Sequence, residues 1–169
     1  MTDVKAIEIA IVDGLEAHLS GRFGRRVTGT IANTTAHVPS YPYFAYTITT
    51  PVDANAKGWC RGSDGSLYRQ LTQVWSLTFC SDQNDAADEI AQYAFEWFDT
   101  LGATYLSDHG AAIERILNFG NRDNMFTIEY EYRRGFDVRV SYMHVISAAQ
   151  AQAETQRIEI ADVAGDINI

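Results

Sequence analysis

The chain has few cysteines and no long apolar run, and each absence excludes a class of protein. Its 169 residues include only two cysteines, Cys60 and Cys80, which are too few for a disulfide framework or a paired-cysteine zinc site. We therefore expect two free thiols. The first ten residues carry acid early and lack an uninterrupted apolar stretch, so we expect neither a signal peptide nor a membrane span.

Basic residues are also scarce, with 13 Lys and Arg against 22 Asp and Glu and a formal net charge of −9. Because nucleic acids are bound mainly through basic surfaces, this balance argues against a nucleic-acid-binding module. The small basic cluster of Arg22, Arg25 and Arg26 is interpreted as a solvated loop. The length and the 46% content of hydrophobic residues predict a single domain over residues 1–169.

Common catalytic motifs are missing as well. The sequence contains no GxxxxGK[ST], HExxH, paired CxxC or GxSxG motif, and GRFGRR at residues 21–26 lacks the lysine and the preceding strand of a phosphate-binding loop. Asp108 and His109 are adjacent on an expected loop, where neighbouring side chains usually point apart. We expect no catalytic residue, no cofactor and no metal site, and hence no enzyme.

What the chain does contain is a long alternating stretch, FTIEYEYRRGFDVRVSY, at residues 126–142. Every second residue except Arg134 is large and apolar, and the residues between are polar or small, which is the period of a β-strand. We predict one long strand, or two consecutive strands broken near Arg134 and Gly135. Such a strand needs paired neighbours and a covering layer to bury its apolar side.

Two helices are predicted to form that layer. Apolar residues recur at intervals of three or four over residues 3–19, which predicts an amphipathic helix that ends at Ser20 and Gly21. His18 near its end is interpreted as offsetting the helix dipole. A second helix is predicted over residues 81–102, with acids in its first turn and a stop at Gly102.

Further strands are predicted at residues 27–35, 42–50, 67–80 and 113–119. The strand at 42–50 should end at Pro51 and form a hairpin with 67–80, in which Gln73 interrupts an apolar row. Residues 52–66 form a long glycine-rich loop between them. After a polar connection at 148–154, the tail is predicted to form a last strand with Ile158 and Ile160 on one face.

These elements predict an α+β fold, with two amphipathic helices on one face of a twisted sheet of five or six mostly antiparallel strands. The other sheet face is partly polar. We interpret it as carrying cross-strand ion pairs on a solvated or interfacial face, with a paired-carboxylate acid–base site as the alternative. The charged residues on this face are Glu129, Glu131, Arg133, Asp137 and Arg139.

Trp59 in the loop at 52–66 is a large aromatic residue that core packing does not explain. Tryptophan and tyrosine are typical interface anchors, because one end of the side chain is apolar and the other can stay hydrated. We therefore predict that the loop and the polar sheet face contact an oligomer neighbour or a partner. The predicted contact residues are Trp59, Arg61, Asp64, Glu131, Arg133, Asp137 and Arg139.

Several segments together resemble the tail or neck terminator proteins of tailed bacteriophages. They are the N-terminal helix, PSYPYFAYTI at 39–48, the helix after SLTFCS, YEYRRGFDVRVSY at 130–142 and RIEIADVAGDI at 157–167. The resemblance covers nearly the whole chain. The matching positions, interpreted as mainly structural, are Pro39, Pro42, Tyr43, Tyr46, Tyr130, Tyr132, Arg133, Arg134, Phe136 and Asp137.

The resemblance implies a virion protein of the head–tail junction, assembled in the bacterial cytoplasm and without catalytic residues. It implies a homo-oligomeric ring, expected to be a hexamer, that stops growth of the tail tube. Its implied partners are the tail-tube protein, the head-completion or connector protein and, in a contractile tail, the sheath protein, with no membrane. Six copies at −9 each would carry a formal charge of −54, so genomic DNA would pass an acidic ring without specific binding.

A second hypothesis comes from a different class. A small α+β enzyme or ligand-binding domain would have a pocket between helices and sheet, with Glu131, Asp137 or His144 near it.

Overall fold

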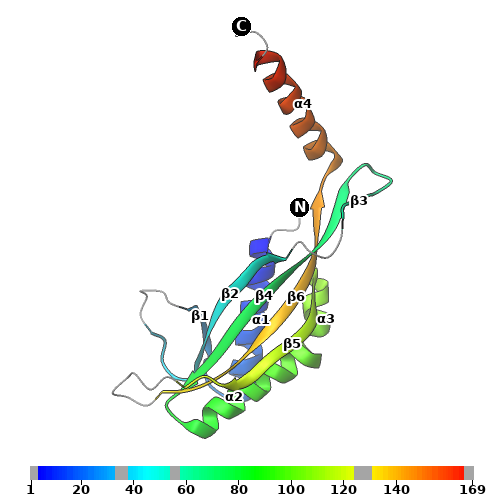
Figure 1. Cartoon of the computed structure of the whole chain (residues 1–169). Helices are drawn as coiled ribbons and strands as arrows, with labels where there is room; N and C mark the ends of the chain where they lie inside the picture. The colour runs from blue at the N-terminus through cyan, green and yellow to red at the C-terminus, as the bar shows by residue number, and fades with distance from the viewer. Residues whose placement is uncertain (1–3, 33–37, 54–57, 124–130, 166–169) are drawn as a thin grey trace.

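The computed structural model describes residues 4–32, 38–53, 58–123 and 131–165. It is an α+β fold, as predicted (Figure 1). In chain order the elements are α1 (Val4–Phe23), β1 (Thr28–Ile31), β2 (Tyr43–Asp53), β3 (Cys60–Arg61), β4 (Leu67–Ser81), α2 (Asn84–Glu96), the π-helix η1 (Trp97–Leu101), α3 (Ala103–Asp108), β5 (Ala111–Asn121), β6 (Tyr132–Ile146) and α4 (Ala148–Gly165).

The sheet is built around its two longest strands. Its six strands have the order β1-β2-β4-β6-β5, with β3 paired to β4. β4 and β6 have 15 residues each and pair without a register shift from Leu67 opposite Ile146 to Ser81 opposite Tyr132. All pairings are antiparallel except β1 with β2. The predicted hairpin partnership of residues 42–50 and 67–80 is confirmed.

β6 confirms the predicted long strand from Tyr132 onward and continues through Arg134 and Gly135 without a break. Residues 126–130 of that prediction lie outside the described residues. The predicted apolar row is buried at Phe136, Val138, Val140 and Tyr142. Opposite this row on β4 lie Leu77, Trp75, Gln73 and Leu71. Gln73 is buried, and its Oε1 accepts a hydrogen bond of 3.2 Å from Nε1 of Trp75, which satisfies both polar groups.

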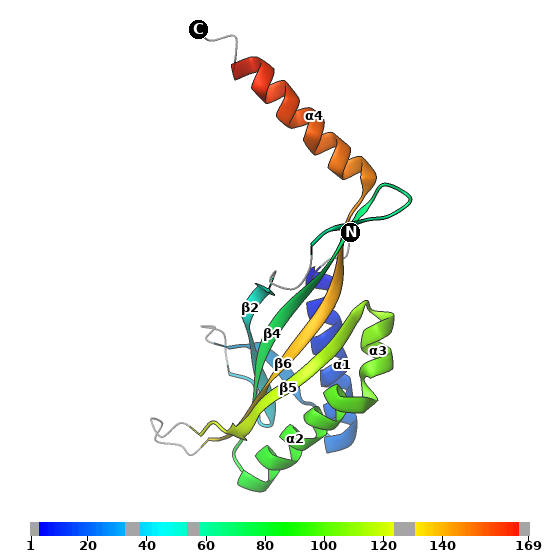
Figure 2. The same ribbon diagram turned by 45° about the vertical axis from the view of Figure 1, so that its right-hand side comes forward.

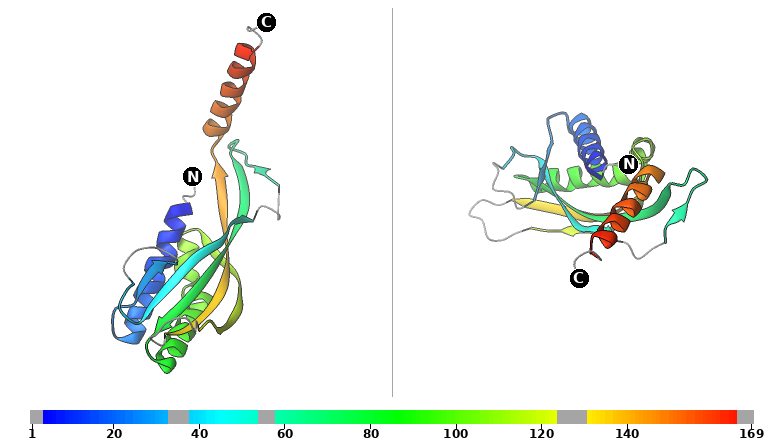
Figure 3. Two further views of the ribbon diagram at one scale, coloured as in Figure 1. Left: turned by 60° about the vertical axis from the view of Figure 1, so that its left-hand side comes forward. Right: turned by 90° about the horizontal axis from the view of Figure 1, so that it is seen from above.

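Helices cover one face of the sheet, as predicted. In Figures 2 and 3, α1, α2 and α3 lie together on one side of the strands. Their buried side chains meet the apolar rows of β4 and β6 in one continuous core. The helical contribution includes Ile7, Ile11, Leu15 and Leu19 of α1, Ala87, Ile90, Ala91 and Ala94 of α2, and Leu106 of α3.

The predicted helix ends need correction. α1 passes through Ser20 and Gly21 and ends at Phe23, where Gly24 adopts a positive φ of 70° that glycine tolerates best. His18 therefore lies inside the helix, so its predicted role at the helix end is wrong. Burial lowers the pKa of its imidazole. The second predicted helix is confirmed but consists of α2 and η1, and α3 follows Gly102.

Pro51 does not end β2, which continues to Asp53. Two features make a proline tolerable there. Register shifts occur between Ile48 and Thr50 and between Thr50 and Asp53, and β1 pairs with β2 only as far as Tyr46. A proline lacks the backbone N–H but fits a bulged strand with an open edge. The loop predicted at 52–66 is also more structured than expected, because β3 pairs with the start of β4 and Gly62 and Ser66 close a turn.

The tail prediction is wrong. Residues expected to form a polar connection and a last strand form α4, which projects away from the body of the molecule (Figure 1). Alanine and glutamine favour a helix, and Ser147 and Gln150 form a capping box. Ser147 Oγ accepts the Gln150 N–H at 3.3 Å, and Gln150 Oε1 accepts the Ser147 N–H at 3.1 Å. None of the helices in the described part of the chain is long and apolar enough to cross a membrane.

The capping box predicts that Ser147→Ala will fray the start of α4. Loss of the cap should cost about 1 kcal/mol of helix stability, seen as faster hydrogen exchange of the amides at residues 151–154. Gln152→Ala is the matched control, because Gln152 is exposed within the same helix. Equal exchange rates in the Ser147 variant and the wild type would contradict this account of why the helix begins there.

Candidate functional site

The polar face of the sheet carries an ordered network centred on Arg122, which follows β5. Nη1 of Arg122 donates to Ser76 Oγ at 2.7 Å and to the Leu77 carbonyl at 3.2 Å. Nη2 forms a 2.8 Å ion pair with Oδ1 of Asp137, and Asn118 donates to the other oxygen of that carboxylate at 2.7 Å. One arginine thus joins β4, β5 and β6 across the face away from the helices.

Gly135 makes this crossing possible. A Cβ atom at position 135 would lie 2.4 Å from the Leu77 carbonyl oxygen and 2.7 Å from the side chain of Arg122. Neither distance is compatible with a side chain. The glycine in the Arg-Arg-Gly segment is therefore a site of close approach for Arg122 rather than a break in the strand.

Arg139 forms a second branch of the network farther along β6. Its Nη2 pairs with Asp53 of β2 at 2.8 Å, and its Nε pairs with Glu114 of β5 at 3.0 Å. These are cross-strand ion pairs on the polar face, as the alternation predicted. Exposed pairs stabilise a fold by only about 0–1 kcal/mol each, so their main effect is to fix the positions of charges on this surface.

Glu131 is the most buried acid of the group. The hydroxyls of Tyr41 and Tyr43 donate to its Oε1 at 3.1 and 2.7 Å, and Arg133 Nε donates to its Oε2 at 2.6 Å. Burial opposes ionisation of this carboxyl, but the hydrogen bonds from Tyr43 and Arg133 and the arginine charge together lower its pKa. Glu131 is therefore held as a carboxylate.

Cys80 lies beneath this cluster. It is opposite both Tyr43 of β2 and Arg133 of β6, and it is buried. Burial, assisted by the charge of Glu131, raises the pKa of its thiol to about 12, which makes Cys80 a poor nucleophile. Both cysteines are free, as predicted, and Cys60 is exposed.

A three-stranded ribbon of β3 and the adjoining ends of β4 and β6 extends beyond the helices (Figure 2). Trp59 lies just before β3, with its ring 5.7 Å from that of His144 and under the guanidinium of Arg69 at 5.9 Å. Arg69 and His144 are direct cross-strand partners. Trp59 is still 42% exposed, so the ribbon holds an aromatic side chain in place without covering it.

Asp64 stabilises the turn at the tip of the ribbon. Its carboxylate accepts hydrogen bonds from the Ser66 N–H at 3.0 Å and from the Ser66 hydroxyl at 2.9 Å. These bonds lower the pKa of Asp64. Beside the turn, Arg61 and Gly65 face the first turns of α4 across a hollow of about 470 Å³.

The alternative hypothesis of an enzyme or ligand-binding domain placed Glu131, Asp137 or His144 near one pocket, and the structure separates these residues. Glu131 precedes β6, Asp137 lies within it and His144 lies near its end. At roughly 3.3 Å per strand residue, Glu131 and His144 are about 40 Å apart. They do not converge on one pocket. Glu129, the other acid of the predicted face, lies outside the described residues.

The dyad at Asp108 and His109 is not formed either. Nδ1 of His109 lies 2.7 Å from the Tyr105 carbonyl oxygen, and the imidazole packs on the Tyr105 ring. In the described part of the chain, no group of three or more His, Cys, Asp or Glu residues is arranged to hold a metal ion.

Several members of the polar network are not among the residues predicted from the sequence, including Arg122 and Tyr41. Their roles depend on contacts over 15 or more residues, such as Arg122 with Asp137 and Tyr41 with Glu131. The only local signal was Gly135, which suggests close approach of another group without identifying it.

Three features are typical of a subunit of an assembly. Polar side chains pair with one another, a projecting ribbon holds an aromatic side chain in place, and a helix leaves the body of the molecule. The family comparison agrees with this class. The phage neck terminator protein family matches residues 10–168, nearly the whole chain, and the protein belongs to that family. It is a structural protein of the phage neck and a virion component. No curated protein matches the chain in sequence.

The role of Gly135 predicts that Gly135→Ala will disrupt the polar face. The new methyl group would displace Arg122 and press on the Leu77 carbonyl, so the free energy of unfolding should fall by about 2 kcal/mol or more. Urea unfolding followed by tryptophan fluorescence measures this. Gly120→Ala is the matched control, because Gly120 is opposite Gly135 and a Cβ atom there would meet no atom within 4 Å. Equal losses in the two variants would contradict the proposed crowding.

The lowered pKa of Glu131 predicts a pH-dependent contribution to stability. Its folded pKa lies below its ordinary value of 4.5, so its stabilisation is present above that pH and is lost as the pH falls through the folded pKa. Glu131→Gln should therefore lower the free energy of unfolding at pH 7, and its difference from wild type should shrink at pH 3. Glu154→Gln, on the exposed part of α4, should change stability little at either pH.

Proposed function

We propose that this neck protein forms a closed homo-oligomeric ring, expected to be a hexamer, that caps the tail tube and joins it to the head connector. The family match over residues 10–168 carries the proposal. The number of subunits and the capping role come from the resemblance of the terminator segments. A sheath protein would be a further neighbour if the tail is contractile, and assembly would take place in the host cytoplasm.

The charge distribution supports passage of DNA without specific binding. The segment from residue 82 to residue 114 contains no lysine or arginine and builds α2, η1, α3 and the start of β5. Its repulsion of phosphate would keep DNA from adhering to this layer. On the polar sheet face, in contrast, Arg122, Arg133 and Arg139 are paired with acids. The acids of this segment are Asp82, Asp85, Asp88, Glu89, Glu96, Asp99, Asp108 and Glu114.

Contacts with the tube or the connector are proposed at two places. The first is the ribbon tip, where Trp59 and Arg61 are exposed and Asp64 shapes the turn. The second is the polar face with Glu131, Arg133, Asp137 and Arg139, whose ion pairs hold charges in fixed positions for a partner surface. The alternative of a small enzyme or ligand-binding domain has less support, because its residues Glu131, Asp137 and His144 are spread along β6.

The ring proposal predicts a change of mass on assembly. Purified protein, alone or mixed with tail tubes that lack a terminator, should form a closed ring, measured by light scattering and by electron microscopy of the tube ends. Trp59→Ala should bind tubes at least about tenfold more weakly if Trp59 is an anchor.

Met143→Ala is the matched control for Trp59→Ala, because Met143 is an apolar residue of the ribbon strands and is 47% exposed. A wild-type chain that stays monomeric in both settings, with bare tube ends, would contradict the proposed function.

A further inference from the structure

We propose that neighbouring copies of this chain join head to tail, with the β5 edge of one subunit against the β1 edge of the next. The inference rests on the proposed ring and identifies the two surfaces that build it. β1 and β5 are the opposite edges of the sheet (Figure 1), so the two surfaces of one chain cannot meet each other. A second copy can bring them together.

The β5 edge presents apolar side chains with hollows between them. Phe119 is 53% exposed, although its ring stacks on Phe136. Leu117 of β5 is also exposed, and its pairing with Asp137 places it on the other face of the strand. One hollow of about 400 Å³ is bordered by Phe95 and Phe119. Exposed apolar side chains gathered beside hollows are typical of a protein interface.

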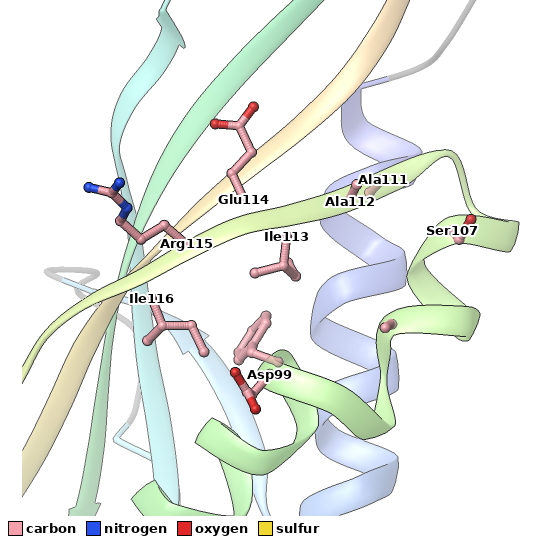
Figure 4. A pocket seen from close by; sticks show the side chains of 10 residues that line it. Asp99, Ser107, Ala111, Ala112, Ile113, Glu114, Arg115 and Ile116 are labelled. Atoms are coloured by element: carbon pink, nitrogen blue, oxygen red, sulfur yellow. The ribbon is translucent and has the colours of Figure 1, made fainter.

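A second hollow, of about 260 Å³, lies between β5 and the η1–α3 segment. Figure 4 shows Ile113, Ile116 and Asp99 around it. Asp99 is exposed and has no ion-pair partner among the described residues. The side of the β5 edge that faces the helices therefore combines an apolar surface with an acidic group that remains available to a neighbour. Arg115 of β5 is also exposed, but it points from the opposite side of the strand, where it is the partner of Arg139 (Figure 4).

The β1 edge has the complementary character. Ile31 of β1 is 49% exposed, and Val38, in the segment that leads to β2, is also exposed. Arg25 and Arg26 lie in the connection between α1 and β1. Both are exposed, and in the described residues neither forms an ion pair, although Arg25 packs on the Phe23 ring. This edge thus combines apolar side chains with unneutralised positive charge.

The two edges fit each other better than either fits itself. Two β1 edges would bring arginines together, and two helix-side surfaces of β5 would bring two copies of Asp99 together, whereas the mixed contact can pair Asp99 with Arg25 or Arg26. A contact between two different surfaces repeats from subunit to subunit and closes into a ring when its rotation allows. The charge pattern therefore selects the geometry that the proposed ring requires.

The contact is assigned to side chains rather than to a continuous strand ladder. β5 has register shifts between Ile113 and Arg115 and between Leu117 and Gly120, and Asn118 has a φ of 56°. Such irregularities hinder addition of a further strand at an edge. The hollows between β5 and the helices remain able to receive apolar side chains such as Ile31.

The test uses one variant for each edge, Leu117→Lys and Ile31→Lys, with Met143→Lys as the matched control. The first two each place a charge at an exposed apolar position of an edge strand, and each should raise the concentration needed for half-assembly at least about tenfold. Met143 is similarly exposed, but it lies on neither edge strand, so its variant should assemble as wild type does. Circular dichroism confirms that each variant is folded.

Mixing the two edge variants tests the head-to-tail arrangement. Each retains the edge that the other has lost, so an equal mixture should form a heterodimer, detected by native mass spectrometry at high concentration, but no ring. Normal rings from either variant alone, or complete rings from the mixture, would overturn the inference while the wild-type ring upholds the proposed function. A wild type that forms no ring, even on tail tubes, would overturn both.

Discussion

The unbroken pairing of β4 with β6 is the constraint on which the rest of the structure depends. Because 15 consecutive residue pairs stay in register, alternate side chains are committed to opposite faces over the whole length. One face gathers Trp75, Leu77, Phe136 and Val138 under the helices. The other face must then carry the charged residues of the same strands, and the ends of both strands must extend past the helices as a ribbon.

The two faces are stabilised by different physical means. The apolar face is held by burial, at roughly 1.5–3 kcal/mol for each large side chain. The polar face is held in a defined shape by ion pairs that contribute little stability individually. Arg122 reaches Asp137 over Gly135, and Glu131 is fixed by Tyr43 and Arg133. For a structural protein of the phage neck, this separation gives a stable body and a surface whose charges stay in place.

The parts that leave this body are consistent with a subunit that works in an assembly. The ribbon holds Trp59 against His144 while leaving much of the indole exposed. α4 starts at a capping box and projects from the body of the molecule, whereas most helical stability in proteins comes from packing of an apolar face. These segments, together with the open edges at β1 and β5, are where neighbouring proteins can add the contacts that the single chain lacks.

The sequence by itself determined the elements with a clear period and the family. Alternation identified β6 and β4, three-to-four spacing identified α1 and α2, and short segments indicated a terminator protein. It failed where local preference was ambiguous, as in the isoleucines of the tail, where Ser147 and Gln150 offered a cap that was overlooked. Only the tertiary structure decided that β2 passes Pro51, that Gly135 admits Arg122 and that Glu131 and His144 lie far apart. Such features depend on which distant segments become neighbours in the sheet, and the period of a single segment contains no information about its partners.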